Sequence, residues 1–224
     1  MRFKKERKSI VKTMRKLNDL KLNKGSSGNI SLRISLNEFL ITSSGVSADL
    51  IQEENIVEMN LDGTFDSLEK PSSEWQIHRN LYRSRFDVNA IVHTHSVNAA
   101  TLSCLRKHLP AFHYMVAVAG GRDIRCCDYE LFGSSRLAEK VESAMLNRWA
   151  CLVANHGLVS CGESLDFATY LAEEVESLCG QYLQALTIGG VHLLNDNQMD
   201  EVIEKFRSYG FNKKAKINEQ NTSF

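Results

Sequence analysis

Strand-like and helix-like segments alternate along this sequence, and their order restricts the fold more than any other feature. Short apolar segments typical of strands occur at residues 32–34, 39–42, 55–59, 88–95 and 149–154. Segments with apolar residues at helical spacing lie around and between them, at residues 10–17, 75–82, 99–105, 134–147, 164–188 and 200–206. This order predicts one α/β domain in which helices cover both faces of a mixed sheet.

Composition and charge exclude several other classes of protein. The chain has 224 residues, of which 43% are hydrophobic, and its formal net charge is zero, whereas domains that bind a nucleic-acid backbone are usually strongly basic. No apolar run approaches the roughly 18 residues that cross a bilayer, and the charged start of the chain does not match a secretory signal peptide. We therefore expect a cytoplasmic protein with no nucleic-acid or membrane partner.

Six cysteines are too few for a disulfide scaffold in a chain of this length. Cys151 and Cys161 lie in apolar stretches and are predicted to be buried thiols. The adjacent residues Cys126 and Cys127 are predicted to be two ordinary thiols.

His93-Thr94-His95 is the strongest local signal for a functional site. Residues i and i+2 of a strand project from the same face, about 7 Å apart along the backbone, which suits two ligands of one metal ion. His156 follows another apolar strand, and Glu74 lies in the first turn of a predicted helix. Three imidazoles and one carboxylate would form a site for zinc or a similar divalent ion.

Each of these residues also has an ordinary structural explanation. Most His-x-His pairs bind no metal, and a single His before Gly is commonly a turn residue. A Glu in the first turn of a helix can serve only the helix dipole. Spacing alone therefore leaves the metal site open.

Several turns of small residues form a second signal. Residues 25–29, 44–45 and 72–73 offer backbone N–H groups and side-chain hydroxyls, and residues 72–73 lie at a predicted helix N-terminus, where an anion is favoured. Ser73 and Gln76 also fit a capping box. Taken singly, an ordinary cap or turn explains each of these segments better than a binding site does.

Jointly, the motifs resemble the class II aldolase/adducin family, and most closely its bacterial L-fuculose-phosphate aldolases. The resemblance extends from residue 22 to about residue 209. The matching segments are residues 25–31, 40–46, 70–75, 90–95, 110–115, 132–133 and 155–158.

The resemblance implies a fold, an assembly and an activity. The fold is a single three-layer α/β/α domain over residues 1–210 with a mixed, mostly antiparallel central sheet, and the polar residues 211–224 are expected to form a flexible tail. The assembly is a homotetramer with active sites shared between subunits and one Zn²⁺ per subunit. The activity is the reversible cleavage of a ketose 1-phosphate, such as L-fuculose 1-phosphate, to dihydroxyacetone phosphate and a small aldehyde resembling L-lactaldehyde.

The resemblance also implies roles for individual residues. The implied metal ligands are Glu74, His93, His95 and His156, with Glu74 also acting as catalytic acid and base. The implied contacts of the substrate phosphate are Gly28, Asn29, Ser44, Gly45, Ser72 and Ser73. Tyr114 is expected to reach a neighbouring subunit's site and protonate the aldehyde oxygen, Phe132 to line the aldehyde pocket, and Phe206 and Tyr209 to belong to a C-terminal segment that closes over a site.

The chemistry of the reaction favours a metal. Cleavage between C3 and C4 leaves negative charge on the ketone half, which a lysine imine or a metal ion must stabilise. The site-forming segments contain no lysine other than Lys70. Two positions depart from the family pattern. Ser43-Ser44 stands where Pro-Thr is usual, which keeps a hydroxyl for the phosphate but loses a rigid proline. Residues 125–128, on the aldehyde side, are also unusual and leave the identity of the aldehyde open.

Three other functions compete with this prediction. Pentulose-phosphate 4-epimerases use the same retro-aldol chemistry, but they usually carry Asp in place of Glu74. Adducin head domains keep the fold as interaction modules and lack the metal ligands. A zinc hydrolase unrelated to the family would need an activated water and would need no phosphate-binding turns.

Overall fold

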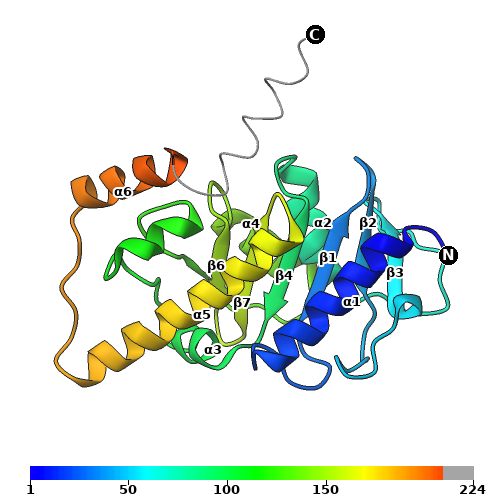
Figure 1. Ribbon diagram of the computed structural model, residues 1–224, viewed down its shortest axis with the longest axis horizontal. Coiled ribbons are helices and arrows are strands. Elements are labelled where there is room, and N and C mark those ends of the chain that lie inside the picture. Colours follow the sequence, from blue (N-terminus) through cyan, green and yellow to red (C-terminus); the bar gives the residue numbers. More distant parts are fainter. Residues whose placement is uncertain (209–224) are drawn as a thin grey trace, which may run out of the picture.

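A seven-stranded mixed sheet runs through the middle of the molecule (Figure 1). The computed structural model describes residues 1–208, with side chains described up to Phe206. The strand order is β3-β2-β1-β4-β7-β6-β5, and all neighbours pair antiparallel except β5 and β6, which are parallel. The strands are β1 (Asn29–Arg33), β2 (Glu38–Thr42), β3 (Ile56–Asn60), β4 (Ala90–Thr94), β5 (Cys126–Cys127), β6 (Ala150–Val153) and β7 (Gly157–Gly162).

Helices cover both faces of this sheet (Figure 1), which confirms the predicted three-layer α/β/α fold. One face carries α1 (Lys4–Asp19), α3 (Val97–Ser103) and α5 (Leu165–Thr187). The other face carries α2 (Trp75–Ser84) and α4 (Ser135–Ala144). The remaining helices are α6 (Asp196–Ser208), the short 3-10 helix η2 (Tyr114–Ala119), against which α6 packs, and the short 3-10 helix η1 (Glu53–Asn55).

Side chains along each strand point alternately to the two faces of the sheet, so the apolar core forms two clusters, one on each face. In β4, Val92 joins the apolar cluster beneath α1, α3 and α5, whereas Ile91 joins the cluster beneath α2 and α4. The register of β1 and β4 places Asn29 opposite His93 and Ser31 opposite Ile91. Asn29 and Ser31 therefore lie on the side of the sheet that α2 covers, where the candidate site is found.

Most predicted elements are present within a few residues of the expected bounds, but β5 and β7 were not predicted. Each of the β7 residues is buried, and this strand lies in the interior of the sheet, so it lacks the polar alternation that marks a half-exposed strand. Cys151 and Cys161 are buried, as predicted, and all six cysteines are free thiols.

The described part of the chain contains no helix with the length and apolar character needed to cross a bilayer. The predicted tail at residues 211–224 and the predicted domain limit at residue 210 lie outside the described residues.

Candidate metal centre and its cavity

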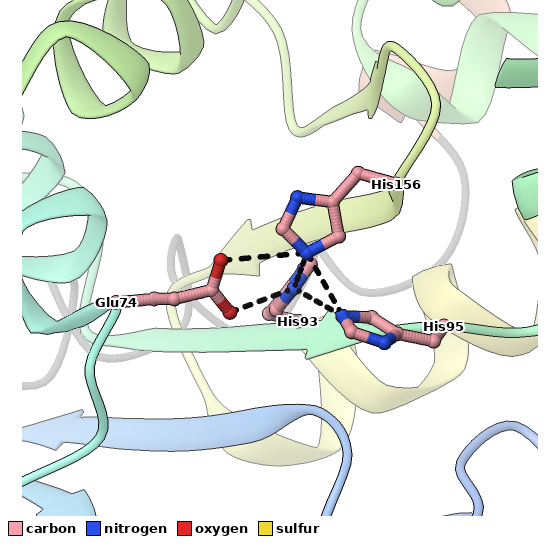
Figure 2. A group of neighbouring side chains, drawn as sticks. All are labelled: Glu74, His93, His95 and His156. Atoms are coloured by element: carbon pink, nitrogen blue, oxygen red, sulfur yellow. Dashed lines mark hydrogen bonds and ion pairs between the residues drawn. The ribbon is translucent and has the colours of Figure 1, made fainter. Parts of the chain in front are cut away.

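Three histidine side chains meet at the end of β4 (Figure 2). His93 belongs to β4, His95 follows this strand, and His156 lies in the turn between β6 and β7. The distances between their Nε2 atoms are 3.0 Å for His93–His95, 3.2 Å for His93–His156 and 3.0 Å for His95–His156. The rings of His93 and His95 therefore converge, as their spacing on a strand predicted.

Glu74 completes the cluster from the direction of α2 (Figure 2). Its Oε2 atom lies 3.1 Å from His93 Nε2, and its Oε1 atom lies 3.4 Å from His156 Nε2. One ligand atom from each of the four residues lies within 4.8 Å of the others. Among the described residues, the fold thus gathers side chains from α2, β4 and the β6–β7 turn at one point.

The capping box predicted for Ser73 and Gln76 is wrong. Helix α2 begins at Trp75, and Glu74 occupies the N-cap position without a side-chain capping bond. The Glu74 backbone N–H donates instead to Ser72 Oγ at 3.3 Å. The Glu74 carboxylate is free of a capping role because it points to the histidines.

The hydrogen bonds of His93 and Glu74 leave atoms that can bind a divalent metal ion. His93 Nδ1 lies 2.8 Å from the carbonyl oxygen of Leu158, which can only accept, so Nδ1 carries a proton and the neutral form of this ring presents its lone pair on Nε2. Glu74 Oε1 is buried without a hydrogen-bond partner, which is costly for a carboxylate oxygen unless a cation is near. Ligand atoms of a tetrahedral zinc ion lie about 3.3 Å apart, close to the separations found here.

Electrostatic interactions favour the protonation states that bind a cation. Burial raises the pKa of Glu74, but the charge and hydrogen bond of His93 outweigh it and hold this pKa well below its usual range. Burial, assisted by the charge of His93, lowers the pKa of His95 to about 3 and that of His156 to about 4. Burial also lowers the pKa of His93, but the Glu74 carboxylate outweighs this effect and the pKa is raised. At pH 7 the cluster therefore offers an ionised carboxylate and two neutral imidazoles.

A buried chain of hydrogen bonds supports Glu74, and the sequence did not point to it. Asn29 Nδ2 donates to Glu74 Oε2 at 3.1 Å, and Asn29 Oδ1 lies 2.5 Å from His78 Nε2. His78 Nδ1 lies 2.6 Å from Ser31 Oγ, which lies 2.7 Å from the Tyr82 hydroxyl. Glu74, His78 and Tyr82 recur at intervals of four residues, and this helical spacing is the signal that could have placed them on one face.

The cluster opens into a cavity of about 510 Å³. The predicted substrate-contact residues that line it are Gly28, Asn29, Ser44, Gly45, Ser72, Ser73 and Phe132, together with Glu74, His95 and His156. Further lining residues, to which the sequence assigned no role, are Ser26, Ser27, Ser43, Tyr129, Glu130 and Asn155.

Glycine is required at one edge of this cavity. Gly28 has φ +74°, and a Cβ atom at this position would lie 2.4 Å from the amide of Asn23. Asn23 in turn accepts a hydrogen bond from the backbone N–H of His95 at 3.1 Å. Asn23 thus packs against Gly28 and is hydrogen-bonded to the backbone of His95, so it links the turn at residues 25–29 to the cluster.

Within one chain, the structure does not bring Tyr114 or Phe206 to the cavity. Tyr114 is 50% exposed at the start of η2, and its ring is stacked on His113. The centroid of this ring lies 6.4 Å from that of Phe206 on α6. Tyr209 lies outside the described residues.

The chain is similar to known sugar-phosphate aldolases over most of its length. The profile of the class II aldolase and adducin N-terminal domain matches residues 8–183. An L-fuculose phosphate aldolase of Haemophilus influenzae is 44% identical over 90% of this chain and 93% of its own. A 5-methylthioribulose-1-phosphate/5-deoxyribulose-1-phosphate aldolase of Rhodospirillum rubrum is 42% identical over 92% of this chain and 93% of its own. A solved structure of L-fuculose 1-phosphate aldolase superposes with a TM-score of 0.87 at 38% identity, covering 90% of this chain and 95% of that one.

Proposed function

Because the chain belongs to the class II aldolase and adducin family, we propose that it is a metal-dependent aldolase that reversibly cleaves a ketose 1-phosphate. The products are dihydroxyacetone phosphate and a small aldehyde, and L-fuculose 1-phosphate, which yields L-lactaldehyde, is the leading substrate. One observation carries this proposal: the four-residue cluster of Glu74, His93, His95 and His156 adjoins a cavity rich in hydroxyl and backbone N–H groups.

We assign one Zn²⁺ to each subunit, held by the four residues of this cluster. A bound zinc ion would act as a Lewis acid and stabilise the negative charge that cleavage leaves on the ketone half. The Leu158 carbonyl supports this assignment, because it orients the His93 ring and fixes its tautomer. Imidazole and carboxylate ligands also bind manganese and cobalt, so elemental analysis of the purified protein decides the metal.

We assign the proton transfer to Glu74. Its Oε2 atom accepts from Asn29, whereas its buried Oε1 atom has no hydrogen-bond partner and is therefore the oxygen available to take a proton. In this role Glu74 moves a proton at a carbon of the dihydroxyacetone phosphate half. General acid–base catalysis of this kind contributes about 10²–10⁴-fold to the rate.

We assign the substrate phosphate to the turns of small residues at Gly28, Ser44–Gly45 and Ser72–Ser73. Residues 72 and 73 precede α2, whose first backbone N–H groups and dipole favour an anion. Asn29 lines the same cavity, but Glu74 and His78 occupy both polar atoms of its amide. A contact between Asn29 and the phosphate would therefore require the amide to give up one of these bonds.

We further propose that the protein is a cytoplasmic homotetramer whose sites are shared between subunits. Tyr114 is half exposed and lies away from the cavity of its own chain, so its hydroxyl is available to a neighbouring one. In this arrangement Tyr114 protonates the aldehyde oxygen, and α6 with Phe206 and the following Tyr209 closes over the site. Phe132, which is 64% exposed at the cavity, contacts the aldehyde.

A second substrate class follows from the relative in Rhodospirillum rubrum. Its printed activity is on 5-methylthioribulose 1-phosphate and 5-deoxyribulose 1-phosphate, and its identity to this chain is within two percentage points of that of the fuculose enzyme. These substrates and L-fuculose 1-phosphate are all ketose 1-phosphates, so the same phosphate and metal contacts serve both classes. The aldehyde half distinguishes them.

A coupled assay for dihydroxyacetone phosphate tests the proposal. The zinc-loaded protein is incubated with L-fuculose 1-phosphate, 5-deoxyribulose 1-phosphate, 5-methylthioribulose 1-phosphate and a pentulose 5-phosphate, and unphosphorylated L-fuculose serves as control. We expect release of dihydroxyacetone phosphate from at least one ketose 1-phosphate, abolished by EDTA. Interconversion of pentulose 5-phosphates without net cleavage would instead identify an epimerase, and inertness toward every sugar would favour a non-catalytic module.

A further inference from the structure

His78 is a fully buried residue that the proposed mechanism does not use. It belongs to α2, and its side chain is hydrogen-bonded to two residues of β1, Asn29 and Ser31, of which Asn29 lines the cavity. Residues Asn29 and Ser31 lie two apart on the strand, and Glu74, His78 and Tyr82 lie four apart along the helix side. Asn29 is hydrogen-bonded to Glu74 and His78, and Ser31 is hydrogen-bonded to His78 and Tyr82.

The chemistry of these groups fixes the direction of every hydrogen bond in the chain. The Glu74 carboxylate can only accept, so the Asn29 atom that faces it is the donor Nδ2. Asn29 Oδ1 can only accept, so His78 Nε2 carries a proton toward it. A neutral His78 then has a lone pair on Nδ1, which accepts from the Ser31 hydroxyl, and Ser31 in turn accepts from the Tyr82 hydroxyl.

The reverse direction is incompatible with an ionised Glu74. If His78 carried its proton on Nδ1, Asn29 would have to turn its amide and present Oδ1 to the carboxylate, and two acceptors would face each other. His78 also stays neutral, because burial lowers its pKa to about 3. The tautomer of His78 thus determines which atom of the Asn29 amide faces the Glu74 carboxylate.

We propose that His78 is a positioning residue for Glu74: Ser31 holds its neutral ring as the Nε2–H tautomer, and the ring holds the Asn29 amide that fixes Glu74 Oε2. The carboxylate is thereby held with Oε2 3.1 Å from His93 Nε2 and Oε1 3.4 Å from His156 Nε2. This role rests on the proposed function, since it concerns the carboxylate assigned to metal binding and proton transfer. His78 does not itself line the cavity; it reaches the site through Asn29, which does.

A pair of substitutions separates the two ring nitrogens. The amide nitrogen of His78→Gln can reach the position of Nε2 and keep the donor to Asn29, whereas the shorter side chain of His78→Asn reaches only the position of Nδ1 and keeps the contact with Ser31. We expect His78→Asn to lower kcat and zinc affinity by about 10–100-fold with KM changed less than about threefold, and His78→Gln to restore at least about a tenth of the wild-type kcat and affinity. Equal values for the two variants, or a wild-type kcat and affinity in His78→Asn, would overturn the proposal.

A spectroscopic measurement tests the same proposal without activity. In ¹⁵N-histidine-labelled, zinc-loaded protein, the ring shifts of His78 should be those of a neutral Nε2–H tautomer. Ser31→Ala should lose this single tautomer, whereas Ser160→Ala, which removes another fully buried strand hydroxyl bonded to the backbone of Val92 and Ala168, should keep it. If His78 in the wild-type protein were in the Nδ1–H or the cationic form, the assignment would be refuted. This test needs no variant, so it holds even if His78→Asn does not fold.

Failure of the two proposals can be told apart. Zinc affinity, measured by competition with a chromophoric chelator, and the His78 tautomer do not depend on the substrate. If the wild-type protein cleaves no ketose 1-phosphate but both measurements agree with expectation, the aldolase function fails and the positioning role stands. If cleavage is found and both measurements disagree, the positioning role fails alone.

Discussion

Among single residues, Glu74 has the greatest consequence for chemistry, because it combines a buried carboxylate with an oxygen that has no hydrogen-bond partner. Glu74→Gln keeps the size of the side chain and removes its charge and its basicity. We expect kcat to fall by about 10²–10⁴-fold, with the fold retained by circular dichroism. Glu58→Gln on β3, at the far edge of the sheet, is the matched control and should retain full activity. A loss below about tenfold in Glu74→Gln would mean that another group moves the proton.

The histidines whose pKa is lowered predict how stability depends on pH in the metal-free protein. The folded-state pKa values of His78 and His95 are lowered to about 3 and that of His156 to about 4, against about 6.5 in the unfolded chain. Between these values the unfolded state binds more protons, so stability is fully present above pH 6.5 and is lost as the pH falls toward 4. The fully buried His78 contributes up to about 1.4 kcal/mol per pH unit in this window, and solvent screening makes the contributions of the more exposed His95 and His156 smaller.

His93 acts in the opposite direction, because Glu74 raises its pKa. Its contribution is fully present below pH 6.5 and is lost as the pH rises through its folded-state pKa. Below pH 6.5 the His93 contribution is therefore constant, so His78, His95 and His156 determine the slope, and the net free energy of unfolding should fall on acidification from pH 6.5 to 4.5. Urea titrations of chelator-treated protein measure this slope, and a pH-independent free energy of unfolding would contradict it.

At the scale of elements, amphipathic segments were predictable and fully buried ones were not. The helices α1 and α5 carry apolar residues on one side, so their periodicity identifies them. Strand β7 is buried throughout, and a run such as residues 157–162 has no periodicity that separates it from a turn. The capping box failed for a different reason: Ser73 and Gln76 are residue types that suit a cap, but the helix begins one residue later and the Glu74 carboxylate points to the histidines.

Distant pairings were also beyond what local sequence can predict. Spacing indicated that His93 and His95 share one side of a strand, but no local pattern places His156 or Glu74 beside them. The residue types alone offered these two as candidates, and the family resemblance assigned them, because it carries information about the whole fold. The resemblance did not single out His78, whose significance depends on the register of β1 against α2.

The first residue of β7, Gly157, directly follows His156 and allows a test of how closely β7 must approach β4 at the cluster. A Cβ atom at Gly157 would lie 2.3 Å from the backbone oxygen of Thr94 and 3.3 Å from His95 Cδ2. Gly157→Ala should therefore push β7 away from β4 at the cluster, weakening zinc affinity by at least about tenfold and lowering the melting temperature. The control is Gly162→Ala at the other end of the same strand, where the Cβ atom would lie 2.4 Å from the Phe167 ring. This variant should lose stability and keep its zinc affinity; equal zinc affinities in the two variants would contradict the prediction.

At the scale of the whole molecule, Tyr114 distinguishes a shared site from a self-contained one. If its hydroxyl serves a neighbouring subunit, Tyr114→Phe should cut cleavage by about 10²-fold or more and change the free energy of unfolding by less than about 1 kcal/mol. Proton exchange on dihydroxyacetone phosphate, followed by NMR in deuterated water, should continue, since it needs only the metal and Glu74. Loss of both reactions would indicate a structural defect.

Mixed oligomers extend this test from the residue to the assembly. Subunits with Tyr114→Phe and subunits with Glu74→Gln, each inactive alone, are co-expressed with different tags and purified as mixed species confirmed by native mass spectrometry. We expect partial recovery of cleavage, because some sites receive an intact Tyr114 from one subunit and an intact Glu74 from the other. A mixed oligomer without recovery would show that each site is built within one chain.

The position of β4 between β1 and β7 has a consequence for how the protein folds. His93 is bonded across 65 residues to Leu158 and lies beside His156, 63 residues away, so the cluster exists only after long chain segments have come together. Contacts of such sequence separation close large loops and make folding slow. A metal ion that needs the finished cluster cannot accelerate those steps, but it must leave before the strands separate. Removing the metal should therefore shorten the lifetime of the native protein in denaturant and leave its refolding rate unchanged.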